Sequence, residues 1–393
     1  MIANSLDDFI IDSRQQSLLK KAADLASKFA ERAEKHDREG SFPFENFQDL
    51  RNAGITALTV PKQYGGQGIS LYDMLLLLDV LAQGDGSTAL GLGWHLGMIM
   101  NLRDARVWDE RQFRQLCENV LQHGALINSC ATEPATGSPS RGGRPETTAR
   151  MNTDGWELSG HKTWSTLSPI LTHIIVTASI EGEEDTGEFL VPGGTPGLEI
   201  VETWNSLGMR ATGSHDLLLK QVRLPKDALV RRFTSRTEQK AKDGSGWLLH
   251  IPATYLGIAA AARNFAVRFA KNYHPNSLQK PISELPGVRE RIGRMETELF
   301  TARTVLYQVA ERWDKHPEQR SKMQGKLAAA KYVATNSALQ IVDSAMRIVG
   351  GQSLLKANPL ERYYRDVRAG LHNPPMDDVT LQIMAKEALE SVE

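Results

Sequence analysis

Two histidines and a pair of aspartates are the residues of this chain best suited to proton transfer. His372 lies in the segment Leu-His-Asn-Pro at 371–374, and Asp377 and Asp378 follow it. His95 lies in Gly-Trp-His-Leu-Gly at 93–97. Imidazole exchanges protons near neutral pH, and a carboxylate can act as a general base within hydrogen-bond reach. The structural alternatives are hydrogen-bonded buried histidines and aspartates that cap a helix over 379–389.

Metal and disulfide chemistry are disfavoured by the cysteine pattern. Cys117 and Cys130 are the only cysteines, and neither has a neighbour at metal-ligand spacing. We expect both to be buried thiols. Two further patterns also predict structure and not chemistry. The glycines at 91, 93 and 97 lie in an apolar helical stretch and indicate helix packing, and the acidic run 181–185 is typical of a solvated hairpin turn.

The composition is that of an ordinary globular protein. The chain has 393 residues, with 46 Lys and Arg against 47 Asp and Glu. That charge balance lacks the basic surplus that nucleic-acid binding requires. No apolar run approaches the roughly 20 residues of a membrane span, and the first residues lack the pattern of a signal peptide. We therefore expect a cytoplasmic protein that binds neither nucleic acid nor membrane.

Hydrophobic periodicity divides the chain into three regions. Helical spacing predicts helices over 13–35, 44–53 and from Ser70 to Gly84, which makes residues 1–123 an all-α domain. Short β-branched runs separated by turns predict a middle β-domain over 124–234. Long helical stretches over 258–271, 288–313 and 322–349 predict a four-helix bundle over 235–393. The expected fold class is α+β.

Four motifs in these regions resemble one known family. Residues 60–68 read Val-Pro-Lys-Gln-Tyr-Gly-Gly-Gln-Gly, and residues 130–138 read Cys-Ala-Thr-Glu-Pro-Ala-Thr-Gly-Ser. Residues 160–166 read Gly-His-Lys-Thr-Trp-Ser-Thr, and residues 207–212 read Leu-Gly-Met-Arg-Ala-Thr. Together they are similar to motifs of the acyl-CoA dehydrogenase superfamily, and the order α, β, α agrees with that fold.

The resemblance implies a bound flavin. It places the backbones of Ala131 and Thr132 at the pyrimidine edge of the ring, together with Gly137 and Ser138, and it places Trp164 and Thr166 against the ring near its N5 atom. A flat aromatic side chain excludes water, while amides and hydroxyls polarise the ring. The structural alternative makes Trp164 an ordinary core residue of a sheet. The family also implies a homotetramer.

The chain departs from the family where the catalytic base is expected. The usual Glu is replaced by Pro374, and the earlier position that some members use falls close to Trp247. Asp377 is the candidate substitute. The segment 371–374 instead resembles the Leu-His-Asp-Pro segment of the dibenzothiophene monooxygenase group, which uses reduced FMN and oxygen. By the same resemblance, His372 and His95 would control protonation during oxygenation.

The segments that hold the adenylate half of FAD in the dehydrogenases also differ. This chain has Lys-Asn-Tyr-His-Pro-Asn at 271–276 and Arg347 at the second place. The cofactor is therefore either FMN or a differently held FAD, and Arg347 could pair with a phosphate.

Three functions remain open on the sequence. The first and favoured one is a monooxygenase that uses reduced flavin on a small substrate, for example an organosulfur compound, with a flavin reductase as partner. The second is an acyl-CoA dehydrogenase with an atypical base, whose partner would be an electron-transfer flavoprotein. The third is a flavin-binding protein without catalysis.

Overall fold

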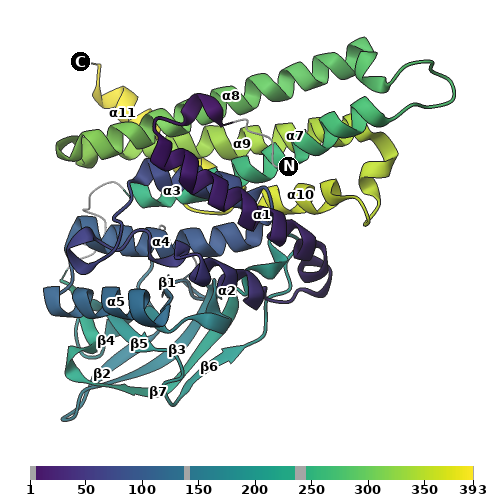
Figure 1. Cartoon of the computed structure of the whole chain (residues 1–393). Coiled ribbons are helices and arrows are strands. Elements are labelled where there is room, and N and C mark those ends of the chain that lie inside the picture. The colour runs from purple at the N-terminus through teal and green to yellow at the C-terminus, as the bar shows by residue number, and fades with distance from the viewer. Residues whose placement is uncertain (1–5, 137–141, 235–244, 393) are drawn as a thin grey trace.

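The computed structural model describes residues 6–136, 142–234 and 245–392. Gly137 and Ser138, two of the expected flavin contacts, lie outside these residues. Figure 1 shows the order of the described elements, with the strands gathered on one side and the long helices of the C-terminal region on the other.

Helices form the N-terminal region, and local sequence signals set two of their starts. The Asp12 carboxylate accepts the Gln15 amide at the start of α1, and Ser70 and Asp73 form a capping box at the start of α3. The helices are α1 (Ser13–Glu39), α2 (Phe44–Asn52), α3 (Leu71–Ala82), α4 (Gly86–Ala105) and α5 (Glu110–His123).

The middle region is one mixed sheet with strand order β6-β7-β3-β2-β4-β5-β8 and with β1 paired to β4 in parallel. The strands are β1 (Ile127–Cys130), β2 (Thr148–Met151), β3 (Trp156–Ser165), β4 (His173–Ile180), β5 (Thr186–Pro192), β6 (Leu198–Val201), β7 (His215–Leu224) and β8 (Leu229–Phe233). The sequence did not predict β6 and β8. The acidic run forms the turn between β4 and β5, as expected.

The C-terminal region returns to helices. The 3₁₀ helix η8 (Gly246–Leu249) leads into α7 (His250–Asn272), which packs with α8 (Pro286–Lys315) and α9 (Gln324–Val349). The shorter α10 (Pro359–Arg368) and α11 (Asp377–Glu390) pack against α9. These helices confirm the predicted C-terminal bundle.

Helix α4 connects the helical and strand regions. It packs against α7 on the bundle side and against β1 on the sheet side, and it lies between these two layers in Figure 1. The glycines at 91, 93 and 97 lie within it, which confirms their role in helix packing. In the described part of the chain no helix is long and apolar enough to cross a membrane.

Candidate active site

Trp164 is held out of the sheet by a local irregularity of β3. The pairing of β3 with β7 shifts register between Lys162 and Ser165, and Trp164 has a φ of +58°. A bulge of this kind redirects a side chain, and a positive φ is strained for any residue with a Cβ atom. The indole is 64% exposed. Trp164 is therefore not a core residue of the sheet, and its position fits a side chain that covers a flat ligand.

A second tryptophan extends the same surface. The rings of Trp164 and Trp204 meet edge to face, with centroids 5.1 Å apart. The Trp204 indole N–H donates to the Met209 carbonyl at 3.1 Å, which fixes this ring to the turn that precedes the 3₁₀ helix η6 (Arg210–Thr212). We call Trp164 and Trp204 the tryptophan platform. It offers an exposed aromatic surface of the kind that a flavin ring requires.

Thr166 lies beneath the platform in a chain of buried hydroxyls. Its Oγ1 atom is 2.9 Å from Ser214 Oγ, which is 2.8 Å from Thr212 Oγ1. Thr212 in turn lies 3.0 Å from the Met209 carbonyl oxygen. The Asn128 side chain donates to the Thr166 carbonyl at 3.1 Å. This series of hydrogen bonds fixes the Thr166 hydroxyl, which the family resemblance assigned to the flavin.

The loop that carries Ala131 and Thr132 is fixed by a buried ion pair. Lys162 Nζ lies 2.5 Å from Glu133 Oε1 and also donates to the Thr177 carbonyl at 2.6 Å. Burial alone would raise the pKa of Glu133, but hydrogen bonds from Lys162 and Thr147 leave that pKa below its ordinary value. The sequence assigned no role to this pair, although both residues lie inside the quoted motifs.

A backbone contact connects that loop to β3. The Thr163 amide donates to the Thr132 carbonyl at 2.9 Å. The expected contacts at 131–132, 164 and 166 therefore belong to one connected unit. This unit carries an exposed aromatic surface and a hydrogen-bonded hydroxyl, which are groups that a flavin site uses.

His372 lies between α10 and α11, and Asp377 is the first residue of α11. The two side chains have different environments. His372 is exposed, while the neighbouring Asn373 side chain accepts the Tyr255 hydroxyl of α7 at 2.6 Å. Asp377 lies in the first turn of α11 and faces α9: its Oδ1 atom is 3.5 Å from Lys331 Nζ, and its Oδ2 atom accepts from Asn336 at 3.0 Å. The aspartate is thus part of the packing between two helices.

His95 has no nitrogen left for catalysis. Its Nδ1 atom accepts the Ile127 amide at 3.1 Å, and its Nε2 atom donates to the Thr56 carbonyl at 2.9 Å. The side chain is fully buried, and burial lowers its pKa to about 4. The hypothesis that His95 handles substrate protons is not supported by this geometry, because both nitrogens already join α4 to the backbone of β1 and of the loop after α2.

A different histidine, His250, has a nitrogen free. It is the first residue of α7, and it packs against Trp247 and Trp94 with ring centroids 5.8 Å and 4.8 Å away. Its Nε2 atom is buried and has no hydrogen-bond partner in the described part of the chain. The sequence interpretation missed this residue because no motif surrounds it.

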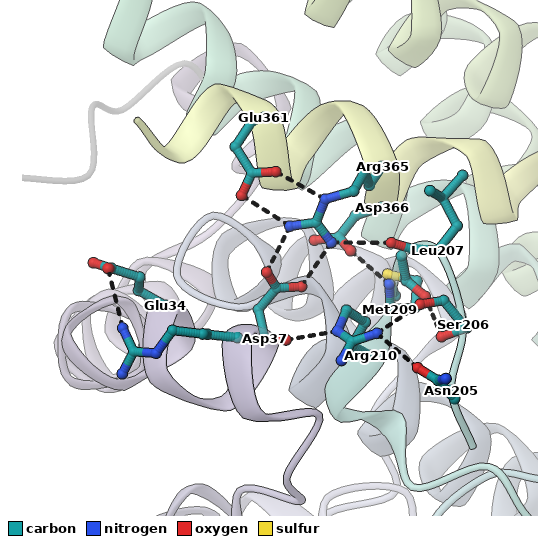
Figure 2. A network of polar contacts seen from close by, with 12 residues as sticks. Glu34, Asp37, Asn205, Ser206, Leu207, Met209, Arg210, Glu361, Arg365 and Asp366 are labelled. Carbon is teal, nitrogen blue, oxygen red and sulfur yellow. Dashed lines mark hydrogen bonds and ion pairs between the residues drawn. The ribbon is translucent and has the colours of Figure 1, made fainter. Parts of the chain in front are cut away.

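Three arginines, Arg210, Arg347 and Arg365, bind neighbouring groups of the protein. Figure 2 shows Arg365 of α10 in contact with Asp37 of α1, at 2.6 Å, and with Glu361. Arg210 donates to the Asp37 carbonyl at 2.7 Å and to the Ser206 carbonyl at 3.0 Å. Arg347 is exposed and pairs with Asp343, one turn earlier in α9, at 2.7 Å. Its expected phosphate contact stays a prediction.

Three domain families match this chain in sequence order. They are the N-terminal domain of acyl-CoA dehydrogenases over residues 12–105, the middle domain over 128–222 and the C-terminal domain over 249–389. A Bacillus subtilis protein named "Putative acyl-CoA dehydrogenase YdbM" is 50% identical over 383 residues, which is 98% of this chain and 99% of that protein.

A second named relative and a solved structure with bound FMN are also similar to this chain. The amino sugar nitrososynthase RubN8 of Streptomyces rubradiris is 31% identical, over 86% of this chain and 81% of its own. A structure of KijD3 in complex with FMN and an amino sugar nucleotide is 25% identical with a TM-score of 0.84, over 98% of this chain and 96% of that one. With these matches and the geometry above, the chain belongs to the acyl-CoA dehydrogenase family of flavin-dependent oxidoreductases.

Proposed function

We propose that this protein is a monooxygenase that uses reduced flavin and oxygen on a small substrate. The observation that carries the proposal is the state of Asp377, the carboxylate closest in sequence to the position of the usual base. Its two oxygens face Lys331 and Asn336 of α9. By the family resemblance, the two positions at which members place a Glu correspond to Pro374 and to a place close to Trp247. Removal of a substrate α-proton needs a general base within reach, and these positions supply none.

Several described residues support this proposal. A bound flavin supplies the reducing equivalents for oxygen. With a flavin bound, the tryptophan platform would lie against the ring and exclude water, and the Thr166 hydroxyl and the loop at 131–132 would orient it. His372 is exposed, and imidazole is a side chain suited to proton transfer. We propose that His372 has this role.

The proposal extends to cofactor and partners. We favour FMN over FAD because the segment at 271–276 and Arg347 depart from the adenylate-binding pattern. A flavin reductase would then supply the reduced cofactor. We also propose a homotetramer, which size-exclusion chromatography with light scattering would test.

The experiment that tests the function is rapid mixing of photoreduced, flavin-loaded protein with oxygenated buffer. We expect flavin absorbance to return in two phases, slower than for free reduced flavin, and we expect His372→Ala to change the slower phase. Reoxidation in a single fast phase would contradict oxygen activation. A slow phase that is unchanged in the variant would remove His372 from the mechanism.

The name of the 50% identical relative favours a second candidate, an acyl-CoA dehydrogenase. That reaction would require Asp377 to leave Lys331 and act as the base. Anaerobic titration with a series of acyl-CoA thioesters tests it, because a dehydrogenase bleaches the flavin without oxygen. Bleaching that is abolished by Asp377→Asn would establish this candidate in place of the first.

A further inference from the structure

The imidazole of His250 presents a buried acceptor. Its Nδ1 atom lies 2.8 Å from the Trp247 carbonyl oxygen, and because a carbonyl only accepts, Nδ1 carries the proton. In a neutral imidazole the other nitrogen, Nε2, is then an acceptor. Burial lowers the pKa of His250 to about 4, so the ring is neutral at neutral pH. Nε2 finds no donor among the residues that the structure describes.

Glycines of α4 allow the His250 and Trp247 rings to pack closely against that helix. A Cβ atom at Gly93 would lie 2.5 Å from His250 Cδ2, and one at Gly97 would lie 2.7 Å from the Trp247 ring. A side chain at either position would displace the imidazole or the indole. The absence of side chains on one face of α4 is thus matched to the two rings of η8 and α7.

Two tryptophans also pack against the His250 ring. Trp94 and Trp247 meet edge to face at 5.7 Å, and both are partly exposed, whereas His250 is fully buried. A ligand that reaches Nε2 therefore meets two indoles and one hydrogen-bond acceptor, which favours a flat apolar body over a charged one.

The two buried histidines next to α4 differ in a way that packing alone does not require. His95 has both nitrogens satisfied by backbone groups, but His250 has only one. Leaving a buried polar atom without a partner is costly, and such atoms are expected where a ligand completes the bond.

We propose that Nε2 of His250 accepts a hydrogen bond from an N–H or O–H group of the substrate and so determines which compounds the enzyme takes. This inference rests on the proposed function and narrows its substrate to small aromatic or heteroaromatic compounds that carry such a donor. A site built for a donor discriminates strongly against an analogue that lacks it, because the acceptor is then left unpaired. Indole and benzothiophene test this directly, since they share one shape and differ in an N–H group against a sulfur atom.

Calorimetric titration of the flavin-free protein with each compound is the experiment. We expect indole to bind at least about tenfold more tightly than benzothiophene, the ratio that one hydrogen bond of roughly 1.4 kcal/mol produces. In His250→Phe, which keeps an aromatic ring without the acceptor, that ratio should fall to about one. His316→Phe makes the same change at an exposed position and should keep the native ratio. Thermal melting of all variants checks that they fold.

Three results would overturn the assignment: equal affinity of the native protein for the two compounds, no binding of either, or a preference for indole that persists in His250→Phe. Flavin binding and oxygen reactivity are measured separately on the same native protein. A preserved indole preference without oxygen reactivity would therefore reject the proposed function and leave the donor site in place.

Discussion

At the scale of single residues, hydrogen-bond partners distinguish two buried histidines that the sequence alone does not distinguish. His95 and His250 are both buried, and burial lowers the pKa of each to about 4. Only His95 binds two backbone groups. Their roles in stability should therefore differ, although the residue type and the degree of burial are the same.

Replacing each histidine by Phe measures that difference. His95→Phe leaves the Ile127 amide and the Thr56 carbonyl unpaired, and each buried orphan costs about 1–3 kcal/mol. His250→Phe removes an acceptor that has no partner and a single hydrogen bond, from Nδ1 to the Trp247 carbonyl, so we expect a smaller loss of about 1 kcal/mol. Urea unfolding of both variants checks this. A loss in His250→Phe as large as in His95→Phe would mean that Nε2 has a partner in the folded protein.

The hydroxyl chain beneath the tryptophan platform leads to a second residue-scale prediction. Because a carbonyl only accepts, Thr212 donates to Met209, Ser214 then donates to Thr212, and Thr166 donates to Ser214. With each proton used in this direction, Thr166 Oγ1 is left as an acceptor. An acceptor at the proposed flavin position suits the N–H group of the reduced ring.

Ser214→Ala would release Thr166 to act as a donor. We expect the preference of the protein for reduced over oxidised FMN, measured as the ratio of the two Kd values, to fall by roughly fivefold to tenfold, the effect of one hydrogen bond of about 1 kcal/mol. Ser168→Ala is the matched control, because the buried Ser168 hydroxyl donates to the Gly213 carbonyl and is not one of the linked hydroxyls that end at Thr166. An unchanged ratio in Ser214→Ala would show that the hydroxyl direction does not matter.

At the scale of elements, α4 shows how packing overrides helix propensity. Glycine inside a helix is less favourable than alanine by about 1 kcal/mol, so propensity alone predicts that Gly→Ala stabilises. At Gly93 the added Cβ atom would lie 2.5 Å from His250. At Gly293 in α8, no described atom lies within 4 Å of the Cβ position.

The two substitutions should therefore have opposite signs. We expect Gly93→Ala to destabilise the protein by about 1–3 kcal/mol through overpacking, and Gly293→Ala to stabilise it by up to about 1 kcal/mol. Chemical denaturation of the two variants gives the comparison. A stabilising Gly93→Ala would show that His250 moves away at little cost and that its packing against α4 is not tight.

At the scale of the whole molecule, one polar network joins all three regions. Asp37 of α1 binds Arg365 of α10, which also donates to the Leu207 carbonyl at 3.0 Å. The neighbouring Asp366 accepts the Met209 amide at 2.5 Å. Burial raises the pKa of Asp366 to about 7. Figure 2 shows these groups between the ends of α1 and α10 and the turn before η6.

The pH dependence of stability follows from the buried groups. His95 and His250 bind protons more readily when unfolded, so each contributes stability that is lost as pH falls from about 6.5 to about 4. Asp366 has the opposite sign: its raised pKa means that stability falls as pH rises from about 3.8 to about 7.

Asp366→Asn removes the loss of stability that Asp366 causes as pH rises, and it keeps a side-chain oxygen that accepts the Met209 amide. The free energy of unfolding of the variant should therefore rise more steeply between pH 4.5 and 7 than that of the native protein. The slope differs by at most about 1.4 kcal/mol per pH unit, which is the value for one group. Parallel slopes would indicate that Asp366 is ionised throughout this range.

The sequence by itself determined what short stretches can specify. Helix starts at Asp12 and Ser70 depend on side chains within three residues, and the long helices follow from their apolar spacing. The motifs at 130–138, 160–166 and 207–212 identified the family for the same reason, because each is a contiguous segment, and through that resemblance they predict the flavin contacts. Strands β6 and β8 were missed, since edge strands need few apolar residues and are defined by their partners.

The tertiary structure decided the environment of each candidate side chain. Asp377 faces Lys331, which lies 46 residues earlier, and His95 binds groups that lie 39 and 32 residues away. His250 packs against glycines of a helix more than 150 residues earlier, and its Nε2 atom has no partner among the described residues. A residue's type determines which hydrogen bonds its side chain can form. Only the folded structure determines which of these bonds are made within the protein, and the donors and acceptors left unpaired are the ones available to a ligand.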